Sequence, residues 1–258
     1  MKQFWKWTAI AAALGSLAMA QKVKSPKEAE AIQAIQNAAT PDDRLAAIET
    51  LLTKFADTEF KVIVLEIASD TVQTKNDPVQ TVIYAERLLE ADPKNLNGIS
   101  TLAKVTSGGI RENDLDKEDK LKRVDELASQ CLKMGPDAKN PNKMITDEQW
   151  MLRKNDFMAD CHDAVAATAI IRKKTDIALT EYQSSLELRK DPATMVRIAQ
   201  VLTAKGKFDD SIAMLEKVQA LPDVNPVVKQ VAGNERVKAI MARQKTKAAA
   251  DSAIPRKQ

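Results

Sequence analysis

The side chains that would suit catalysis gather in one short segment of this chain, Asp160-Cys161-His162-Asp163. A thiol next to an imidazole is the pairing that nucleophilic catalysis uses, with the histidine as base. The surrounding residues, however, have the apolar spacing of a helix, and consecutive side chains on a helix point about 100° apart. Cys161 and His162 therefore cannot face each other, and we expect His162 to be a packed helix residue.

Other signs of chemistry are missing from the sequence. His162 is the only histidine, which removes any metal site built on two imidazoles. We find no glycine-rich phosphate loop, nucleophile elbow, zinc-binding HExxH or calcium loop. Acid pairs such as Asp209-Asp210 stand at helix starts, where they offset the helix dipole. The sequence predicts a protein that is not an enzyme and holds no metal or cofactor, with an enzyme accessory protein or a hydrolase as a minor alternative.

Cys131 and Cys161 are the only cysteines. In an oxidising compartment such a pair can form a disulfide. Free cysteines are also common as small buried apolar side chains, so the sequence leaves a disulfide and two separate buried thiols as alternatives.

Residues 1–20 have the layout of a secretory signal peptide. Lys2 and Lys6 precede an apolar run that ends in Ala18-Met19-Ala20, with small residues at the two positions that a signal peptidase reads. The run is too short to cross a bilayer core of about 30 Å as a helix. We expect export to the periplasm, or to the extracellular space as the alternative, without a membrane span after cleavage.

The composition favours helices and disfavours nucleic acid as a partner. Charged residues make up 29% of the chain, aromatic residues 4%, and there are seven glycines. Loss of two lysines with the signal peptide lowers the net charge from +3 to +1. Binding to nucleic acid needs clustered positive charge, so we exclude that class.

Helix-start signals recur along the chain as a capping residue followed by proline, and apolar residues follow at helical spacing. Ser25-Pro26-Lys27-Glu28 has the additional glutamate of a capping box. The predicted helices cover about 25–38, 40–55, 59–74, 78–92, 95–105, 115–134, 147–172, 175–190, 193–204, 208–221 and 226–244. The fold class is all-α, with no convincing strand.

The last helix pairs match each other at a spacing of 33 residues, which superposes Ser211 on Ala178 and Ala199 on Ala166. With this spacing the sequence resembles the tetratricopeptide repeat (TPR) family. The family pattern has small residues where two helices cross, a large apolar residue one turn later, a turn glycine and a closing proline. The positions that carry it here are Ala166, Ala178, Tyr182, Ala199, Gly206, Ser211 and Leu215.

The repeats are clearest over 62–93 and 159–222, and Asn76 and Lys173 take the turn position that glycine holds at Gly206. The resemblance implies an α-α superhelix, a right-handed α-solenoid of TPR-like helix pairs, over residues 21–244. Residues 245–258 are predicted to be a frayed basic tail.

The resemblance also implies a function. First helices of such pairs line a face that can hold a segment of another protein. The family register places eight residues on that face: Asp160, Asp163, Ala167, Ile170, Val196, Arg197, Gln200 and Thr203. We expect an exported, non-catalytic scaffold of the cell envelope with a protein or peptide partner. A passive structural or assembly subunit is the alternative, and the oligomeric state stays open.

Overall fold

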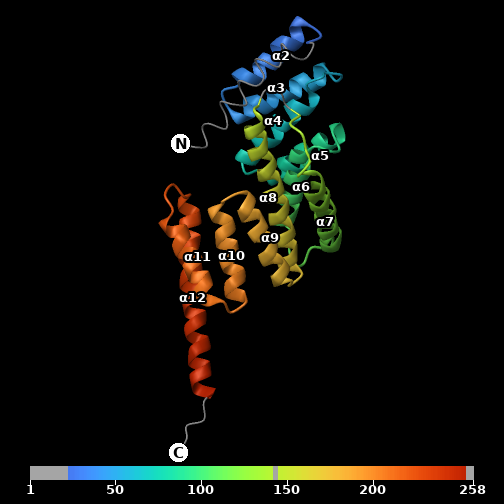
Figure 1. Ribbon diagram of the computed structural model, residues 1–258. Coiled ribbons are helices and arrows are strands. Elements are labelled where there is room, and N and C mark those ends of the chain that lie inside the picture. The colour runs from blue at the N-terminus through green and yellow to red at the C-terminus, as the bar shows by residue number, and fades with distance from the viewer. Residues whose placement is uncertain (1–22, 142–144, 254–258) are drawn as a thin grey trace, which may run out of the picture. The chain divides into compact units, whose positions relative to one another are not determined.

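The computed structural model describes residues 23–141 and 145–253, and every regular element within these ranges is an α-helix (Figure 1). The predicted signal peptide, residues 1–20, and residues 254–258 of the predicted tail lie outside the described residues. The all-α prediction is confirmed. The helices are α2 (Pro26–Asn37), α3 (Pro41–Lys54), α4 (Lys61–Thr74), α5 (Pro78–Ala91), α6 (Leu96–Gly109), α7 (Lys117–Met134), α8 (Asp147–Ile171), α9 (Thr175–Leu188), α10 (Pro192–Ala204), α11 (Phe208–Ala220) and α12 (Pro226–Ala253).

The chain divides into two compact units, residues 1–161 and 162–258. Unit 1 contains α2 to α7 and the greater part of α8. Unit 2 contains the end of α8 and α9 to α12. Within the described ranges, no helix is both long enough and apolar enough to span a bilayer.

Capping bonds confirm the predicted starts of α3 and α5. Thr40 Oγ1 accepts from Asp43 N at 3.1 Å, and Asp77 Oδ1 accepts from Gln80 N at 3.0 Å. In both helices proline follows the cap, where its missing N–H costs nothing. These caps satisfy backbone donors that the first turn of a helix cannot pair internally.

The capping box at α2 differs from its usual form. Ser25 Oγ accepts from Glu28 N at 3.2 Å, as predicted. The Glu28 carboxylate reaches back to Lys24 N at 2.6 Å and also accepts from Thr58 Oγ1 at 2.6 Å. Glu28 is only 1% exposed, so these two donors compensate a buried carboxylate and tie the start of α2 to the loop after α3.

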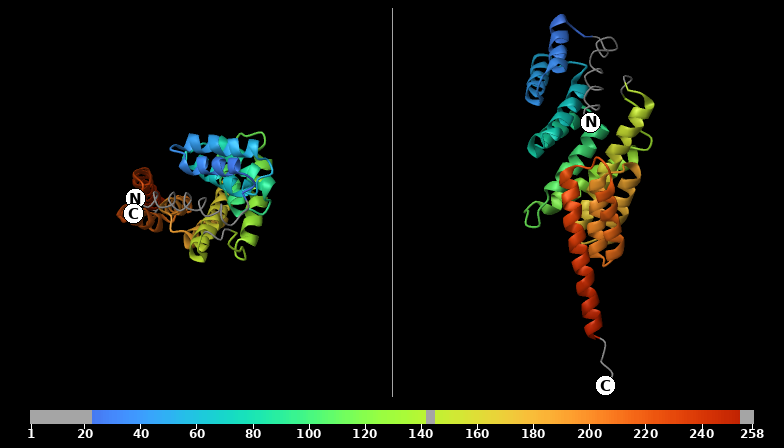
Figure 2. Two further views of the ribbon diagram at one scale, coloured as in Figure 1. Left: turned by 90° about the horizontal axis from the view of Figure 1, so that it is seen from above. Right: turned by 90° about the vertical axis from the view of Figure 1, so that its left-hand side faces the viewer.

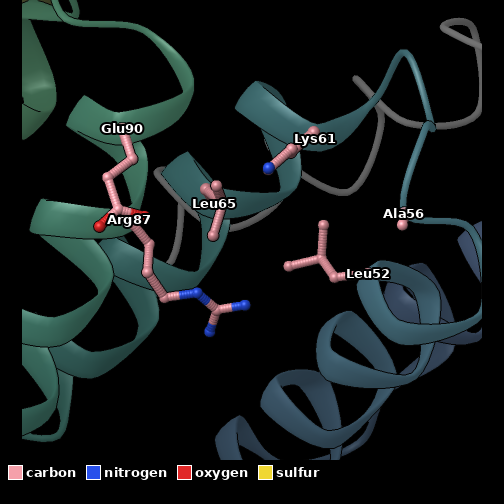
Figure 3. A pocket seen from close by; sticks show the side chains of 6 residues that line it. All are labelled: Leu52, Ala56, Lys61, Leu65, Arg87 and Glu90. Carbon is pink, nitrogen blue, oxygen red and sulfur yellow. The ribbon is translucent and has the colours of Figure 1, made fainter.

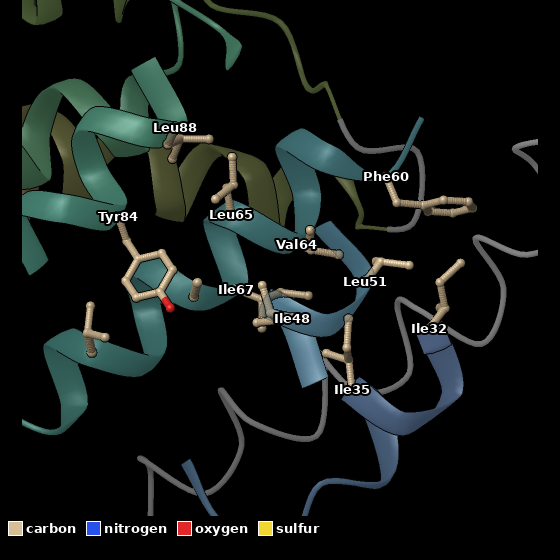
Figure 4. Packing of buried hydrophobic residues seen from close by; sticks show 12 residues of the cluster. Ile32, Ile35, Ile48, Leu51, Phe60, Val64, Leu65, Ile67, Tyr84 and Leu88 are labelled. Carbon is tan, nitrogen blue, oxygen red and sulfur yellow. The ribbon is translucent and has the colours of Figure 1, made fainter. Parts of the chain in front are cut away.

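The core of unit 1 forms where helix pairs stack (Figure 4). Ile35 of α2, Ile48 and Leu51 of α3, Leu65 of α4 and Leu88 of α5 are at most 1% exposed. They belong to one continuous cluster that runs from α2 to α5. No single pair could bury these side chains alone, so each pair stabilises its neighbour.

Unit 2 has the close helix contacts that the repeat register predicts. Ala178, Ala199, Ser211 and Leu215 are all 0% exposed. Ser211 Oγ of α11 donates to the carbonyl oxygen of Ala199 in α10 at 2.7 Å. A side chain can reach a main-chain carbonyl of the facing helix only when the two helices lie close together, and the small residues at the crossing permit this.

Three turns between paired helices share one conformation. Asn76, Lys173 and Gly206, the predicted turn positions, have φ of 53°, 58° and 73°. In each turn the next residue's N–H bonds to the carbonyl five positions earlier: Asp77 to Val72, Lys174 to Ala169 and Lys207 to Leu202. This is the Schellman ending of a helix, for which glycine is the usual residue.

Two helices run further than the sequence indicates. We expected the fifth helix to end near Val105, with Ser107, Gly108 and Gly109 as a turn, but α6 continues through Gly109. We expected fraying from Lys245, but α12 is helical to Ala253. The end of α12 extends past α11 in Figure 1 and in the right-hand view of Figure 2. Alanine-rich sequence favours helix there, and no proline intervenes before Pro255.

The turns generate a matched pair of stability predictions. Lys173→Gly removes the cost of a left-handed conformation for a side chain with Cβ and should raise the free energy of unfolding by about 0.5 to 1 kcal/mol. Gly206→Ala should lower it by about 1 kcal/mol, because a Cβ at Gly206 meets nothing within 4 Å and only the backbone conformation is penalised. Urea unfolding of both variants tests this, and equal effects of the same sign would contradict it.

Candidate partner-binding surface

Cys131 of α7 and Cys161 of α8 are joined by a disulfide in unit 1. Their Cα atoms are 6.6 Å apart, within the range that a disulfide spans without backbone movement. Both side chains are fully buried. The two cysteines are 30 residues apart in sequence, and the bond ties the middle of α8 to α7.

In unit 2, the Asp163 carboxylate is buried and bonded to neighbouring helices, so it does not face a partner. It is 8% exposed. Its Oδ2 accepts from Arg189 Nη2 at 3.3 Å and Arg197 Nη1 at 3.4 Å, and Thr194 Oγ1 lies at 3.3 Å. Asp163 thus connects the end of α8 with the start of α10, where its charge is balanced.

The other residues of unit 2 assigned to a partner-facing row divide between surface and interior. Ile170 is 41% exposed and Gln200 is exposed, while Ala167 is half-buried. Val196 is only 5% exposed and packs with Ala199 and Leu215. We therefore correct its assignment: α10 turns Val196 towards the core. Thr203 Oγ1 of α10 lies 2.8 Å from Ser211 Oγ of α11. Thr203 therefore bonds to the second helix of its own pair.

His162 is a half-buried helix residue, as the sequence indicates. Its Nδ1 lies 2.7 Å from Glu181 Oε2 of α9. The contact joins α8 to its partner helix, so His162 has a structural role. Within the part of the chain that the structure describes, no three potential metal-ligating side chains come together.

Unit 1 contains a row of polar side chains that we call the first-helix polar row, because it follows the first helices α4 and α6 and the facing part of α8. Asn95 Nδ2 donates to Glu66 at 2.8 Å, Asn97 Nδ2 donates to Asp70 at 3.2 Å, and Gln73 Nε2 donates to Thr101 at 3.2 Å. The row consists of Glu66, Asp70, Gln73, Asn95, Asn97, Thr101, Lys104, Arg153 and Asp160. Asp156 is included by its spacing alone, because it lies on the same face of α8 as Arg153 and Asp160.

Ion pairs extend the row onto α8. Lys104 Nζ donates to both oxygens of Asp160 at 3.1 and 3.0 Å, and Arg153 Nη2 lies 3.6 Å from Asp70 Oδ2. The side chains of Asp70, Arg153 and Lys104 remain 29%, 33% and 49% exposed. The row therefore combines hydrogen-bonded amide side chains with charged groups that solvent or a partner can reach.

Burial raises the pKa of the Glu66 carboxyl above its ordinary value, and the hydrogen bond from Asn95 acts in the opposite direction. A raised carboxyl pKa means that the folded chain disfavours the charged form. Ionised Glu66 is therefore less stable in the fold than in the unfolded chain.

The sequence contains a signal for this row that we did not use. Glu66, Asp70 and Gln73 follow i, i+4, i+7 spacing in α4, and Asn97, Thr101 and Lys104 repeat that spacing in α6. Such spacing places three side chains on one face of a helix. Of the row, only Asp160 was among the predicted site residues.

A hollow of about 150 Å³ lies among α3, α4 and α5 (Figure 3). Its rim includes Arg87, whose guanidinium already binds Glu49 through Nη1 at 2.5 Å and Nη2 at 3.2 Å. Typical small-molecule sites measure about 300 to 1,000 Å³, so this hollow is too small for one. The residues lining it are Leu52, Ala56, Lys61, Leu65, Arg87 and Glu90.

The fold was compared with solved structures. TTC0263, a thermophilic TPR protein from Thermus thermophilus, superposes with a TM-score of 0.52 at 16% identity, over 78% of this chain and 90% of that one. MamA protein gives 0.40 at 16% identity, over 78% and 100% of the two chains. The assembly chaperone of RpL4, Acl4 (residues 1–338), gives 0.44 at 12% identity, over 87% and 99%. No protein-family model and no curated protein matches the sequence.

Fold and repeat register together define the class of this protein. Paired helices cross at small residues, turn through a left-handed residue and stack on the next pair, and a TPR structure superposes on this fold. The chain is an α-solenoid of TPR-like helix pairs, which confirms the resemblance seen in the sequence.

Glu66 provides a test of the electrostatics of the row. Because the folded-state pKa of Glu66 is raised, its ionisation opposes folding above the ordinary glutamate pKa of about 4.3. Glu66→Gln keeps an acceptor for Asn95 and should raise the melting temperature at pH 7. The gain should shrink as the pH falls towards 4, where wild-type Glu66 is protonated. Thermal unfolding of both proteins from pH 4 to 8 checks this, and a gain that grows at low pH would contradict it.

Proposed function

We propose that this chain is an exported, non-catalytic scaffold that binds an extended segment of another protein along the first-helix polar row. The observation that carries the proposal is the repetition of polar residues with one spacing on α4 and α6. Burying polar groups on helices is costly unless they are paired, and apolar residues would pack these faces more simply. A polar row that remains partly exposed therefore fits a binding surface better than a packing surface.

The chemistry of the row defines the segment it would bind. Three carboxylates, on Asp70, Asp156 and Asp160, stand with two cations, Lys104 and Arg153, and burial disfavours the charged form of Glu66. Complementary charge steers association and disfavours partners of like charge. The bound segment should accordingly carry net positive charge, and its main chain would bond to side chains at the exposed edge of the row.

Two observations support export. The N-terminal residues have signal-peptide layout, and the buried Cys131–Cys161 disulfide is a bond that persists in oxidising compartments. The periplasm is the compartment we propose, and the cell envelope is where the partner would be met.

A site-specific crosslink tests the binding surface. A photoreactive residue in place of Lys104, on the exposed edge of the row, should capture a protein segment of net positive charge in intact cells. The matched control is the same residue in place of Val79, which is 68% exposed on the second helix α5. Mass spectrometry of the crosslinked peptides identifies the segment.

The crosslink has clear opposing outcomes. Capture of one defined segment from position 104 and none from position 79 supports the proposal. Equal capture at both positions, or capture only of another copy of this chain, would sink it and would favour the passive assembly subunit.

Export has its own measurement. The protein recovered from a periplasmic fraction should begin at Gln21 and contain no free thiol under denaturing, non-reducing conditions, because cleavage follows Ala20 and both cysteines are bonded. Edman sequencing and a thiol titration check this. A chain that begins at Met1 with two titratable thiols would contradict export.

A further inference from the structure

The last helix, α12, has an apolar stripe on the side that faces away from its own unit. Val228, Ala232 and Ala239 point inward, where Ala232 packs with Leu215 and Val218 of α11. The opposite side exposes four large apolar side chains. These are Val227, Val231, Val237 and Met241, which are 64%, 38%, 48% and 62% exposed.

Such a face is unusual for the final helix of a repeat array. Terminal helices normally present polar residues to water, which keeps the open end of a solenoid soluble. At the other end of the described chain, α2 follows that rule and exposes Glu30, Gln33 and Asn37. The apolar stripe of α12 is therefore a face that is built to be covered.

The spacing of the stripe has mirror symmetry about Asn234. Val231 lies three residues before Asn234 and Val237 three residues after it, and Val227 and Met241 lie seven residues to either side. Two copies of α12 in antiparallel orientation would place Val227 opposite Met241 and Val231 opposite Val237. Asn234 would meet its own copy on the two-fold axis, where two amides can bond reciprocally.

The charges fit the same register. Lys245 lies eleven residues after Asn234 and Asp223 lies eleven residues before it, in the turn that leads into α12. Both side chains are exposed. An antiparallel pair would bring each Lys245 towards the turn before α12 of the other copy, which contains Asp223, whereas a parallel pair would align lysine with lysine. Antiparallel helices also oppose their dipoles favourably.

We propose that the stripe Val227, Val231, Asn234, Val237 and Met241 is a homodimer interface in which α12 pairs antiparallel with α12 of a second copy about a two-fold axis through Asn234. One pair of helices of about four turns buries less than the standard interface of about 1,600 Å². The dimer is accordingly weak, and its population depends on protein concentration. This proposal is independent of the partner segment proposed for unit 1.

Cysteine crosslinking tests the register directly, since both native cysteines are bonded. Asn234→Cys should crosslink to itself with a short bismaleimide. Val227→Cys alone and Met241→Cys alone should not, because each lies about 21 Å from its own copy in the antiparallel register. An equimolar mixture of the two should crosslink. Val79→Cys, which lies at a similarly exposed position on α5, is the control and should not crosslink to itself.

Sedimentation equilibrium tests the affinity. Val231→Glu should weaken dimerisation at least about tenfold, because it places an unpaired charge against Val237 of the other copy. Val79→Glu should leave the dimerisation constant unchanged. Monomer at every concentration of the wild-type protein, or self-crosslinking of Val227→Cys, which indicates parallel pairing, would overturn the proposal.

Discussion

Close contact between the two helices of a pair is the interaction on which the rest of this structure depends. Where α10 crosses α11, the side chain of Ser211 is short enough to bond to the carbonyl of Ala199 at 2.7 Å. Larger side chains at this crossing would separate the helices and open space beside Leu215, which is now fully buried. The small residues therefore set the distance, and the large residues next to them fill the gap to the next pair.

That contact requires the chain to reverse in very few residues. The left-handed residue at Asn76, Lys173 and Gly206 makes this reversal, and the same pattern of two backbone bonds closes all three turns. Glycine adopts the conformation freely, whereas Lys173 adopts it at a cost in backbone energy. The surrounding pair compensates for this cost, because the packing of Ala166, Ala178 and Tyr182 holds both helices in place.

Polar side chains inside such an array have to be satisfied by neighbours. Asp163 is satisfied by two arginines and a threonine, which makes it part of the scaffold. The first-helix polar row is satisfied partly by amides from the next helix and partly by ion pairs that remain accessible to solvent. Asp163 thus has a structural role, whereas the charged groups of the first-helix polar row can be approached by a partner. The positions of these residues in the sequence did not distinguish the two roles.

The sequence by itself determined the class of fold, the helix starts and the turn positions. These features depend on local chemistry: Thr40 and Asp77 cap their own helices, and Asn76, Lys173 and Gly206 stand at fixed distances from the crossing residues. Only the tertiary structure decided which way Val196 points, what Asp163 binds, and that Cys131 meets Cys161. It also decided that α12 continues to Ala253 with Val227 and Met241 exposed. Such outcomes depend on contacts between residues far apart in the chain, and the periodicity of a single helix contains no information about its neighbours.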